Sequence, residues 1–417
     1  METQGEWKAW LMLVTAVLVS CGVVWGLARA VGLPIQYNLR NVVVRWRSSI
    51  ATVLGIGAVV AVFVVLRAVA RGIEANSGNT GDPVNVLIVR KGSQAESGSL
   101  VSRDQFQTLR FFEEIQRNEQ GEPMASAEVM LVVNAPRRDG TGEANTLLRG
   151  VTPRGVDLRS QVRLTGGRWF EPGKREVVTA QRLAQRFDGF EIGGTIKAGP
   201  TQLRVVGQME AGGSAFDSEV WMDADEARAI FDRDQYSSIL VRPRDEESMA
   251  VLIGRVDADP RLSLRAERET EYYAKQTMTA KPIKVVAGLL GVAMSVGAVF
   301  AAMNTMYASV ASRTREVGTL RVLGYSRTAV VICFLIEGAC LSTLGGILGC
   351  AVARSTDGFS TGTLDFQSFA ESVFQFRVTP DLMGMGLLFA VGIGVIGSLL
   401  PAIRAARIPV IAALKSI

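Results

Sequence analysis

The 417-residue chain contains no histidine and only four cysteines. Without imidazole, Ser-His-Asp hydrolysis, histidine acid–base catalysis and most zinc sites are excluded. All four cysteines lie in apolar stretches, and none forms a Cys-x-x-Cys pair, which argues against a disulfide framework or a thiolate metal site: Cys21, Cys333, Cys340 and Cys350. Charged residues are scarce at 20%, and the mean hydropathy is +0.23. This composition is too apolar for most soluble enzymes and indicates a membrane protein.

Five apolar runs are long enough to cross a bilayer, which takes about 20 residues of helix. These predicted spans are Trp10–Val31, Ile50–Ala70, Val285–Tyr307, Ala329–Val352 and Leu382–Leu400. The residues before the first run include Glu2 and Glu6 against one Lys8. That flank is unlike the basic start of a signal peptide, so we predict an uncleaved anchor with its N-terminus outside.

Basic residues concentrate in the segments between these runs. Three segments, Gly32–Ser49, Ala308–Arg327 and the tail after Pro401, carry ten basic residues and one acidic residue. The whole chain has a net charge of only +5, so all other segments together are acidic. The basic pI therefore reflects the positive-inside rule and does not indicate nucleic-acid binding. We expect the three basic segments to be cytoplasmic and the long segment Arg71–Ile283 to be outside.

The outer segment shows short strand patterns interspersed with helical ones, without phosphate-binding turns. Strands are predicted at Val84–Val89, Ala127–Ala135, Thr146–Val151, Glu176–Thr179, Thr195–Lys197, Leu203–Met209, Val220–Met222, Ser238–Val241 and Leu262–Ala266. Helices are predicted at Ser102–Arg117, Gln181–Phe187, Ala224–Phe231 and Glu246–Val256, and from about Glu267 into the third span. The fold class is a polytopic α-helical membrane protein with an inserted α+β extracytoplasmic domain. We expect an anchor (1–33), a cytoplasmic elbow with a span (34–70), the outer domain (71–283) and a three-span membrane domain (284–417).

Motifs for catalysis are missing from the sequence. The nearest match to the nucleotide-binding pattern G-x-x-x-x-G-K-[ST] is Gly166–Arg175, which lacks the first glycine at the required spacing and the final hydroxyl residue. The segment Gly212–Phe216 resembles G-x-S-x-G but lacks its last glycine. We therefore expect no catalytic residue, cofactor or metal in this chain.

The segment Met303–Arg327 is a basic amphipathic stretch between two predicted spans. Val317, Leu320, Val322 and Leu323 lie among four arginines. Such a stretch can rest on anionic lipid headgroups or dock on a cytoplasmic protein, and its composition leaves both readings open.

Small residues recur every four positions in two spans, at Gly291 and Ser295 and at Gly345 and Gly349. Such faces let helices approach closely, either within one chain or across a dimer seam. Glu337 lies about two turns into the fourth span, and a carboxylate at that depth is a candidate functional site. We favour a structural ion pair with Arg327 or an arginine of the tail.

Four parts of the sequence resemble the FtsX/MacB-like ABC transporter permease family, which combines a MacB-type periplasmic core domain with an FtsX-like permease domain. Thr314–Arg321 followed by Leu323-Gly324 resembles its coupling-helix signature. Tyr37–Arg40, Pro401–Arg407, and Trp169–Glu171 with Glu176–Val178 are similar to the family's elbow, C-terminal end and periplasmic core. The resemblance runs from about Leu33 to the end, and the extra first span departs from the family's four-span plan.

The resemblance implies a bacterial inner-membrane permease subunit whose cytoplasmic ABC ATPase partner binds and hydrolyses ATP on a separate chain. Movement would pass from that ATPase to the outer domain for export or extraction of a substrate. The residues that carry over as the ATPase-coupling site are Arg315, Glu316, Gly318, Arg321 and Gly324. The resemblance also implies pairing of the permease, as a homodimer or with a second permease, a periplasmic adaptor and contact with membrane lipid. We expect no nucleic-acid partner.

Glu316 also has a simpler reading, a pair with Arg313 three residues before it in the same helix. At the level of function, the alternative is a non-transporting membrane regulator that binds and activates an extracytoplasmic cell-wall enzyme. A membrane-anchored enzyme is the weakest reading, because the sequence holds no catalytic constellation.

Overall fold

The computed structural model describes residues 46–78, 80–199, 201–276, 281–364 and 371–411. The chain divides into two compact units. Of the described residues, the membrane unit comprises 46–71, Pro282–Phe359 and 375–411, and the outer unit comprises those within Gly72–Lys281 and Ser360–Phe374. The predicted anchor Trp10–Val31 and the Tyr37–Arg40 elbow lie outside the described residues.

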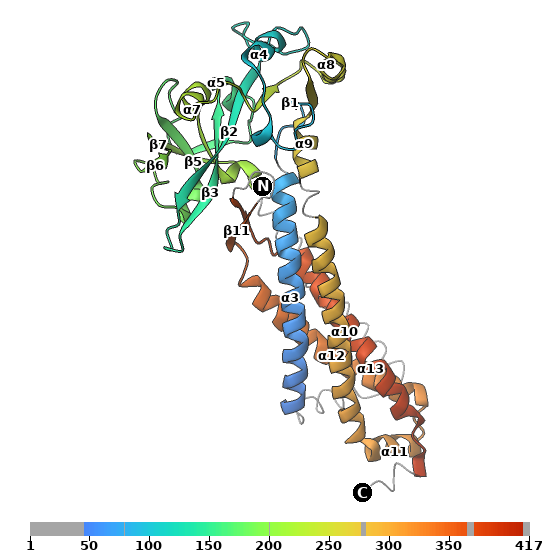
Figure 1. Ribbon diagram of the computed structural model, residues 1–417. Coiled ribbons are helices and arrows are strands. Elements are labelled where there is room, and N and C mark those ends of the chain that lie inside the picture. The colour runs from blue at the N-terminus through green and yellow to red at the C-terminus, as the bar shows by residue number, and fades with distance from the viewer. Residues whose placement is uncertain (1–45, 79, 200, 277–280, 365–370, 412–417) are drawn as a thin grey trace. The chain divides into compact units, whose positions relative to one another are not determined.

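The membrane unit is built from long apolar helices and a short helix that connects two of them (Figure 1). The helices are α3 (Trp46–Gly78), α10 (Lys281–Ala311), α11 (Thr314–Val322), α12 (Arg327–Arg354) and α13 (Pro380–Arg407). All but α11 are long and apolar enough to span a bilayer, at Ser49–Ile73, Gly288–Ala311, Arg327–Arg354 and Pro380–Arg407. A helix satisfies its own backbone groups, which the hydrocarbon core demands. The last four of the five predicted spans are thereby confirmed.

Close packing joins α12 to α13 through small residues. A Cβ atom added to Gly394 would lie 2.5 Å from the Cβ of Ser342, and one added to Gly338 would lie 2.7 Å from the Cβ of Ser398. These two helices are correspondingly the most buried of the four spans, at 61% and 50%, whereas α10 is only 17% buried. Among the described residues, α10 is therefore the least covered of the four spans.

The outer unit contains one large mixed sheet. Its order is β10-β1-β9-β2-β3-β8-β5-β7-β4, with β6 paired to β7. The strands are β1 (Val86–Arg90), β2 (Ala125–Pro136), β3 (Glu143–Val151), β4 (Arg163–Gly167), β5 (Glu176–Ala180), β6 (Thr195–Ala198), β7 (Thr201–Glu210), β8 (Glu219–Asp223), β9 (Ser238–Val241) and β10 (Leu264–Arg268). Two neighbouring pairs, β3 with β8 and β5 with β7, are parallel, and the others are antiparallel.

Short helices accompany this sheet (Figure 1). They are α4 (Arg103–Leu109), α5 (Pro153–Asp157), α6 (Gln181–Arg186), α7 (Ala224–Ile230), α8 (Glu246–Ala258) and α9 (Glu269–Gln276), with 3-10 turns η1 (Glu96–Gly98) and η2 (Ala215–Ser218). Every residue of β8 and β9 is buried, so these strands form the centre of the core. Asp223 caps α7 by accepting a hydrogen bond from the Glu226 amide at 3.2 Å.

The predicted α+β class is confirmed, and the predicted strands are present with small shifts at their ends. The predicted helix Ser102–Arg117 is wrong in its second half, because α4 ends at Leu109. Beyond that point Ile115 forms a β-bridge with Pro243, and the Gln116 amide donates to the Arg242 carbonyl at 2.8 Å. Tertiary pairing thus overrides the helical spacing of the apolar residues. Strand β4 was not predicted.

A second difference is the two-stranded sheet of β11 (Ser360–Leu364) and β12 (Glu371–Gln375). The sequence places this segment inside a single membrane domain, 284–417, but Ser360–Phe374 groups with the outer unit. Glu371 forms ion pairs with Arg137 and Arg186, and Val373 lies fully buried in the core of the outer unit. These long-range contacts explain why no local pattern predicts the placement.

Candidate coupling surface on α11

Local chain signals define α11 as a separate short helix between two spans. Its first residue follows Arg313, whose backbone is non-helical. At the other end Gly324 has a φ of +96°, a conformation that glycine adopts without steric cost. Ser326 then caps α12 by accepting a hydrogen bond from the Ala329 amide at 3.1 Å. The chain therefore turns once at Arg313 and again at Gly324, and α11 lies between α10 and α12.

One face of α11 is anchored on three spans. Val317 belongs to an apolar cluster with side chains of α10, α12 and α13: Met306, Val310, Val330, Phe334, Ala402, Ala405 and Ala406. Gly318 is also buried. A displacement of α11 would therefore be felt by all three spans, because a close-packed interior transmits strain.

A buried ion pair fixes the beginning of α11. The Arg313 Nη1 lies 2.5 Å from the Glu337 Oε2, and the two side chains are only 4% and 5% exposed. The Ser309 hydroxyl lies 3.4 Å from the other Glu337 oxygen. The prediction that Glu337 pairs with Arg327 or a tail arginine is wrong, although its partner is an arginine. Arg313 is the first basic residue after the third span, and one turn of chain brings it back toward α12.

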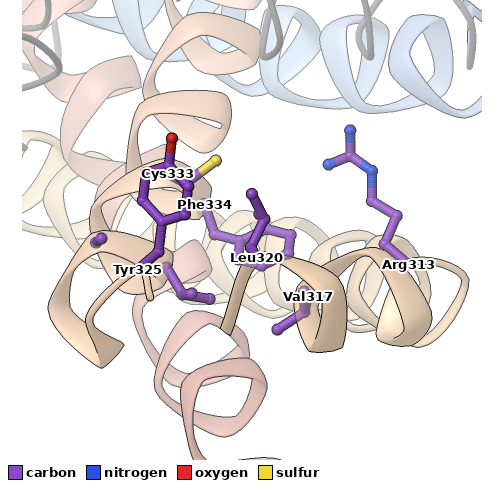
Figure 2. Close-up of a pocket in the computed structure, with 8 residues that line it drawn as sticks. Arg313, Val317, Leu320, Tyr325, Cys333 and Phe334 are labelled. Atoms are coloured by element: carbon purple, nitrogen blue, oxygen red, sulfur yellow. The ribbon is translucent and has the colours of Figure 1, made fainter. Parts of the chain in front are cut away.

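The space beside this corner is small (Figure 2). In Figure 2, Leu320 and Val317 lie between Tyr325 and Cys333 at one end and Arg313 at the other. The enclosed volume is about 10 Å³, which is at most enough for a single water. This corner is a packed joint and does not form a binding site for a small molecule.

The five residues expected to couple to an ATPase occupy different environments. Arg315, Glu316 and Gly324 are exposed, whereas Gly318 is buried. Arg321 is partly buried and donates a hydrogen bond to the Tyr325 carbonyl at 3.1 Å, so it stabilises the turn after α11. Glu316 lies 3.6 Å from the Arg313 Nε, which matches the helix-internal pair weighed from the sequence.

Two apolar side chains complete the outward face. Val322 is 61% exposed and Leu323 is 70% exposed. We call them the apolar tip. They are not among the predicted coupling residues, because only charged residues and glycines carry over from the coupling-helix signature. Their place at the end of an amphipathic stretch is the sequence signal that could have identified them. Exposed apolar residues on a fixed helix are a typical contact for a partner.

The small residues noted in the spans differ in their surroundings. A Cβ on Gly345 would lie 3.0 Å from the Val53 carbonyl oxygen, and one on Gly349 would lie 2.5 Å from that of Gly57. Both glycines therefore let α12 approach α3 within one chain. On α10, a Cβ on Gly291 would meet no atom within 4 Å among the described residues. Ser295 donates its hydroxyl to the Gly291 carbonyl at 2.6 Å.

The structure has membrane helices on both sides of an inserted mixed sheet and a short helix between two spans. This is the arrangement of an ABC transporter permease, and the comparisons with known proteins agree with it. A family model for the MacB-like periplasmic core domain matches residues 48–258, just over half of the chain. A second model, for the FtsX-like permease C-terminal region, matches residues 288–410. The chain belongs to the MacB/FtsX-like permease family. It is an inner-membrane protein with a large extracytoplasmic domain.

Two curated relatives illustrate the similarity. The macrolide export ATP-binding/permease protein MacB of Rhodopseudomonas palustris (strain BisB18) is 27% identical over 305 residues, which cover 67% of this chain and 44% of that protein. The uncharacterized ABC transporter permease YknZ of Bacillus subtilis (strain 168) is 30% identical over 138 residues, which cover 33% of this chain and 32% of that protein. The chain thus spans less than half the length of these relatives.

Solved structures with similarity to the outer region include the extracellular domain of YknZ from Gram-positive bacteria. It has a TM-score of 0.33 and 13% identity, and covers 44% of this chain and 99% of its own. The periplasmic region of MacB from Actinobacillus actinomycetemcomitans gives a TM-score of 0.36 and 14% identity, and covers 47% of this chain and 92% of its own.

Proposed function

We propose that the chain is the permease subunit of an ABC transporter complex, and that it couples ATP hydrolysis by a separate cytoplasmic ATPase to movements of the outer unit, for export or extraction of a substrate. The observation that carries this proposal is α11 itself. It presents the apolar tip, Val322 and Leu323, on one side and is anchored on α10, α12 and α13 on the other. A partner that moves the tip would move three spans.

A protein partner fits the outward face better than a lipid surface. Arg321 uses its guanidinium on the Tyr325 carbonyl, and the carboxylate of Glu316 is half-exposed. That leaves Arg315 as the exposed base on α11, next to an acid that anionic headgroups would repel. An apolar tip with one exposed base and one exposed acid suits a groove in a folded protein.

The family supports an ATPase partner. The Bacillus subtilis relative is named as an ABC transporter permease, and the residues of this sequence form no recognisable nucleotide-binding loop. The proposal therefore places nucleotide binding on a partner ATPase and gives the permease a non-catalytic role.

Pairing with a second permease chain is part of the proposal. Four exposed apolar side chains share one face of α10: Leu289, Val292, Val296 and Phe300. Gly291 lies on the opposite side of the helix, where an added Cβ would meet no atom within 4 Å among the described residues. An apolar face with little cover in the described part of the chain suits association with another span. A periplasmic adaptor remains a prediction from the family resemblance.

Photo-crosslinking in native membranes tests the coupling surface. A photoreactive residue would replace Leu323 in one variant and Phe111, which is 63% exposed on the outer unit, in a matched control. We expect the Leu323 variant to capture a P-loop ATPase and the Phe111 variant to capture none. If neither position captures an ATPase, or both do so equally, α11 is not the coupling surface.

A further inference from the structure

The 3-10 turn η2 (Ala215–Ser218) contacts each of the three chain segments that lead from the outer unit to the membrane unit. The first segment is the exit from α3, the second is α9, which precedes α10, and the third is the β11–β12 hairpin between α12 and α13. The contacts all lie within the outer unit. They are made by Ala215, Phe216 and Ser218 of one short turn.

Each contact has a defined geometry. The Ala215 amide donates to the Thr80 Oγ1 at 2.8 Å, just beyond α3. The Phe216 ring packs edge-on against the Tyr273 ring of α9, with centroids 5.7 Å apart. The Ser218 hydroxyl accepts from the Val373 amide at 2.9 Å and lies 3.2 Å from the Val373 carbonyl, which accepts its proton. The turn is therefore joined to all three segments by direct contacts.

These contacts are shielded from water. Thr80, Phe216 and Val373 are fully buried, and Tyr273 and Ser218 are nearly so. Buried hydrogen bonds do not exchange freely with solvent, and leaving one unmade is costly. If one segment shifts, water cannot replace the buried hydrogen bonds that it makes with the turn. The shift therefore strains the turn.

The turn is stiffened by its own residue Asp217. One carboxylate oxygen accepts from the Ala211 amide at 2.6 Å, and the other accepts from the Gly213 amide at 2.7 Å. Arg182 adds an ion pair at 3.4 Å. Because these bonds hold both ends of the loop before η2, the turn moves as one piece.

Behind the turn lies a buried charge network. Glu219 directly follows Ser218 and accepts from the Arg149 Nε at 2.8 Å. Arg149 also contacts the Tyr273 hydroxyl at 3.2 Å, so α9 and β8 share one set of buried partners. Burial disfavours ionisation and, as the largest influence, raises the pKa of Tyr273 well above its usual value.

We propose that η2 is a mechanical junction of the outer unit, at which displacement of any one of the three connecting segments is passed to the other two and to β8. The hairpin is then a third connecting element and not a passive loop. This inference concerns transmission within the outer unit, and it does not depend on which partner drives the movement.

Hydrogen exchange of the full-length protein in detergent tests the junction. The variant Ser218→Ala removes both bonds to Val373. Its matched control is Ser214→Ala, because the buried Ser214 hydroxyl has no hydrogen bond among the described residues. Exchange should accelerate about 25-fold in residues 371–375, as expected for two lost hydrogen bonds of about five-fold each. It should also accelerate more than about two-fold in residues 269–276 of α9, and the control should change neither segment.

The reciprocal variant Thr80→Val removes the contact to the Ala215 amide and should accelerate exchange in residues 371–375, which it does not touch. Unchanged exchange in β5 shows that the sheet remains folded in each variant. The junction is refuted if Ser218→Ala affects only residues 371–375 and Thr80→Val leaves the hairpin unchanged, or if Ser214→Ala has the same effects as Ser218→Ala.

Discussion

The ion pair between Arg313 and Glu337 gives the sharpest prediction for the membrane unit. Two charges lie 2.5 Å apart with almost no exposure to solvent. Replacing Arg313 by Met leaves a buried carboxylate without its guanidinium, and this change should destabilise the folded protein by about 3–5 kcal/mol, because an uncompensated charge remains in a low-dielectric site. Replacing Glu337 by Met leaves the Arg313 guanidinium with the half-exposed Glu316 carboxylate at 3.6 Å, so its cost should be smaller but still larger than that of an exposed pair.

The double variant decides whether the pair acts as a unit. With both residues replaced by Met, no buried charge remains, so the free energy of unfolding should fall by less than in either single variant. A matched control is the pair of Arg354 and Asp357 at the end of α12, which is considerably more exposed. Replacing Arg354 by Met should cost no more than about 1 kcal/mol.

Unfolding of the purified protein by titration of mixed micelles with SDS would measure these free energies. The reasoning is refuted if the Arg313 and Glu337 variants are additive in the double variant, or if each single variant costs no more than the Arg354 control. In either case α11 would not be held to α12 by this pair.

Two further predictions concern helix packing and an outer-unit ion pair. Gly349→Ala should destabilise the protein by about 1–3 kcal/mol, because the new Cβ meets α3. Gly291→Ala should not, because no described atom lies within 4 Å of its new Cβ. SDS titration compares the two variants, and equal effects would contradict the packing. Arg168 donates to both oxygens of Glu176 at 2.7 Å and lowers the pKa of that carboxyl. The pair's stabilisation is therefore present above the unfolded pKa of about 4.5 and lost as pH falls through the lower folded value. Unfolding curves of Arg168→Met should lack this loss, and an unchanged pH dependence would count against the pair.

Much of the architecture is predictable from local patterns. Apolar length predicts the spans, because about 20 residues of helix are needed to cross a bilayer. Alternating apolar residues predict most strands of the outer unit. The errors occur where distant partners decide the conformation. Ile115 leaves the helical pattern to pair with Pro243, and β12 belongs to the outer unit because Glu371 and Val373 find partners there.

The position of α11 was predictable from the sequence, but its contacts were not. The basic amphipathic segment identifies α11, and glycine at position 324 marks its end. Local spacing could not show that Arg321 bonds to the Tyr325 carbonyl, or that Glu337 lies against Arg313. The first contact depends on the exact geometry of the turn after α11, and the second depends on how α12 returns beside α10, which is a property of tertiary packing.

Native co-purification in mild detergent, followed by mass spectrometry, tests the central claim most directly. We expect a P-loop ATPase to accompany the wild-type chain in a ratio near one to one. It should be lost from Leu323→Asp, which places a charge in the apolar tip, and retained in Phe111→Asp, a matched change on the outer unit. Recovery of an extracytoplasmic enzyme without any ATPase would contradict the coupling account and would instead indicate a membrane-anchored regulator.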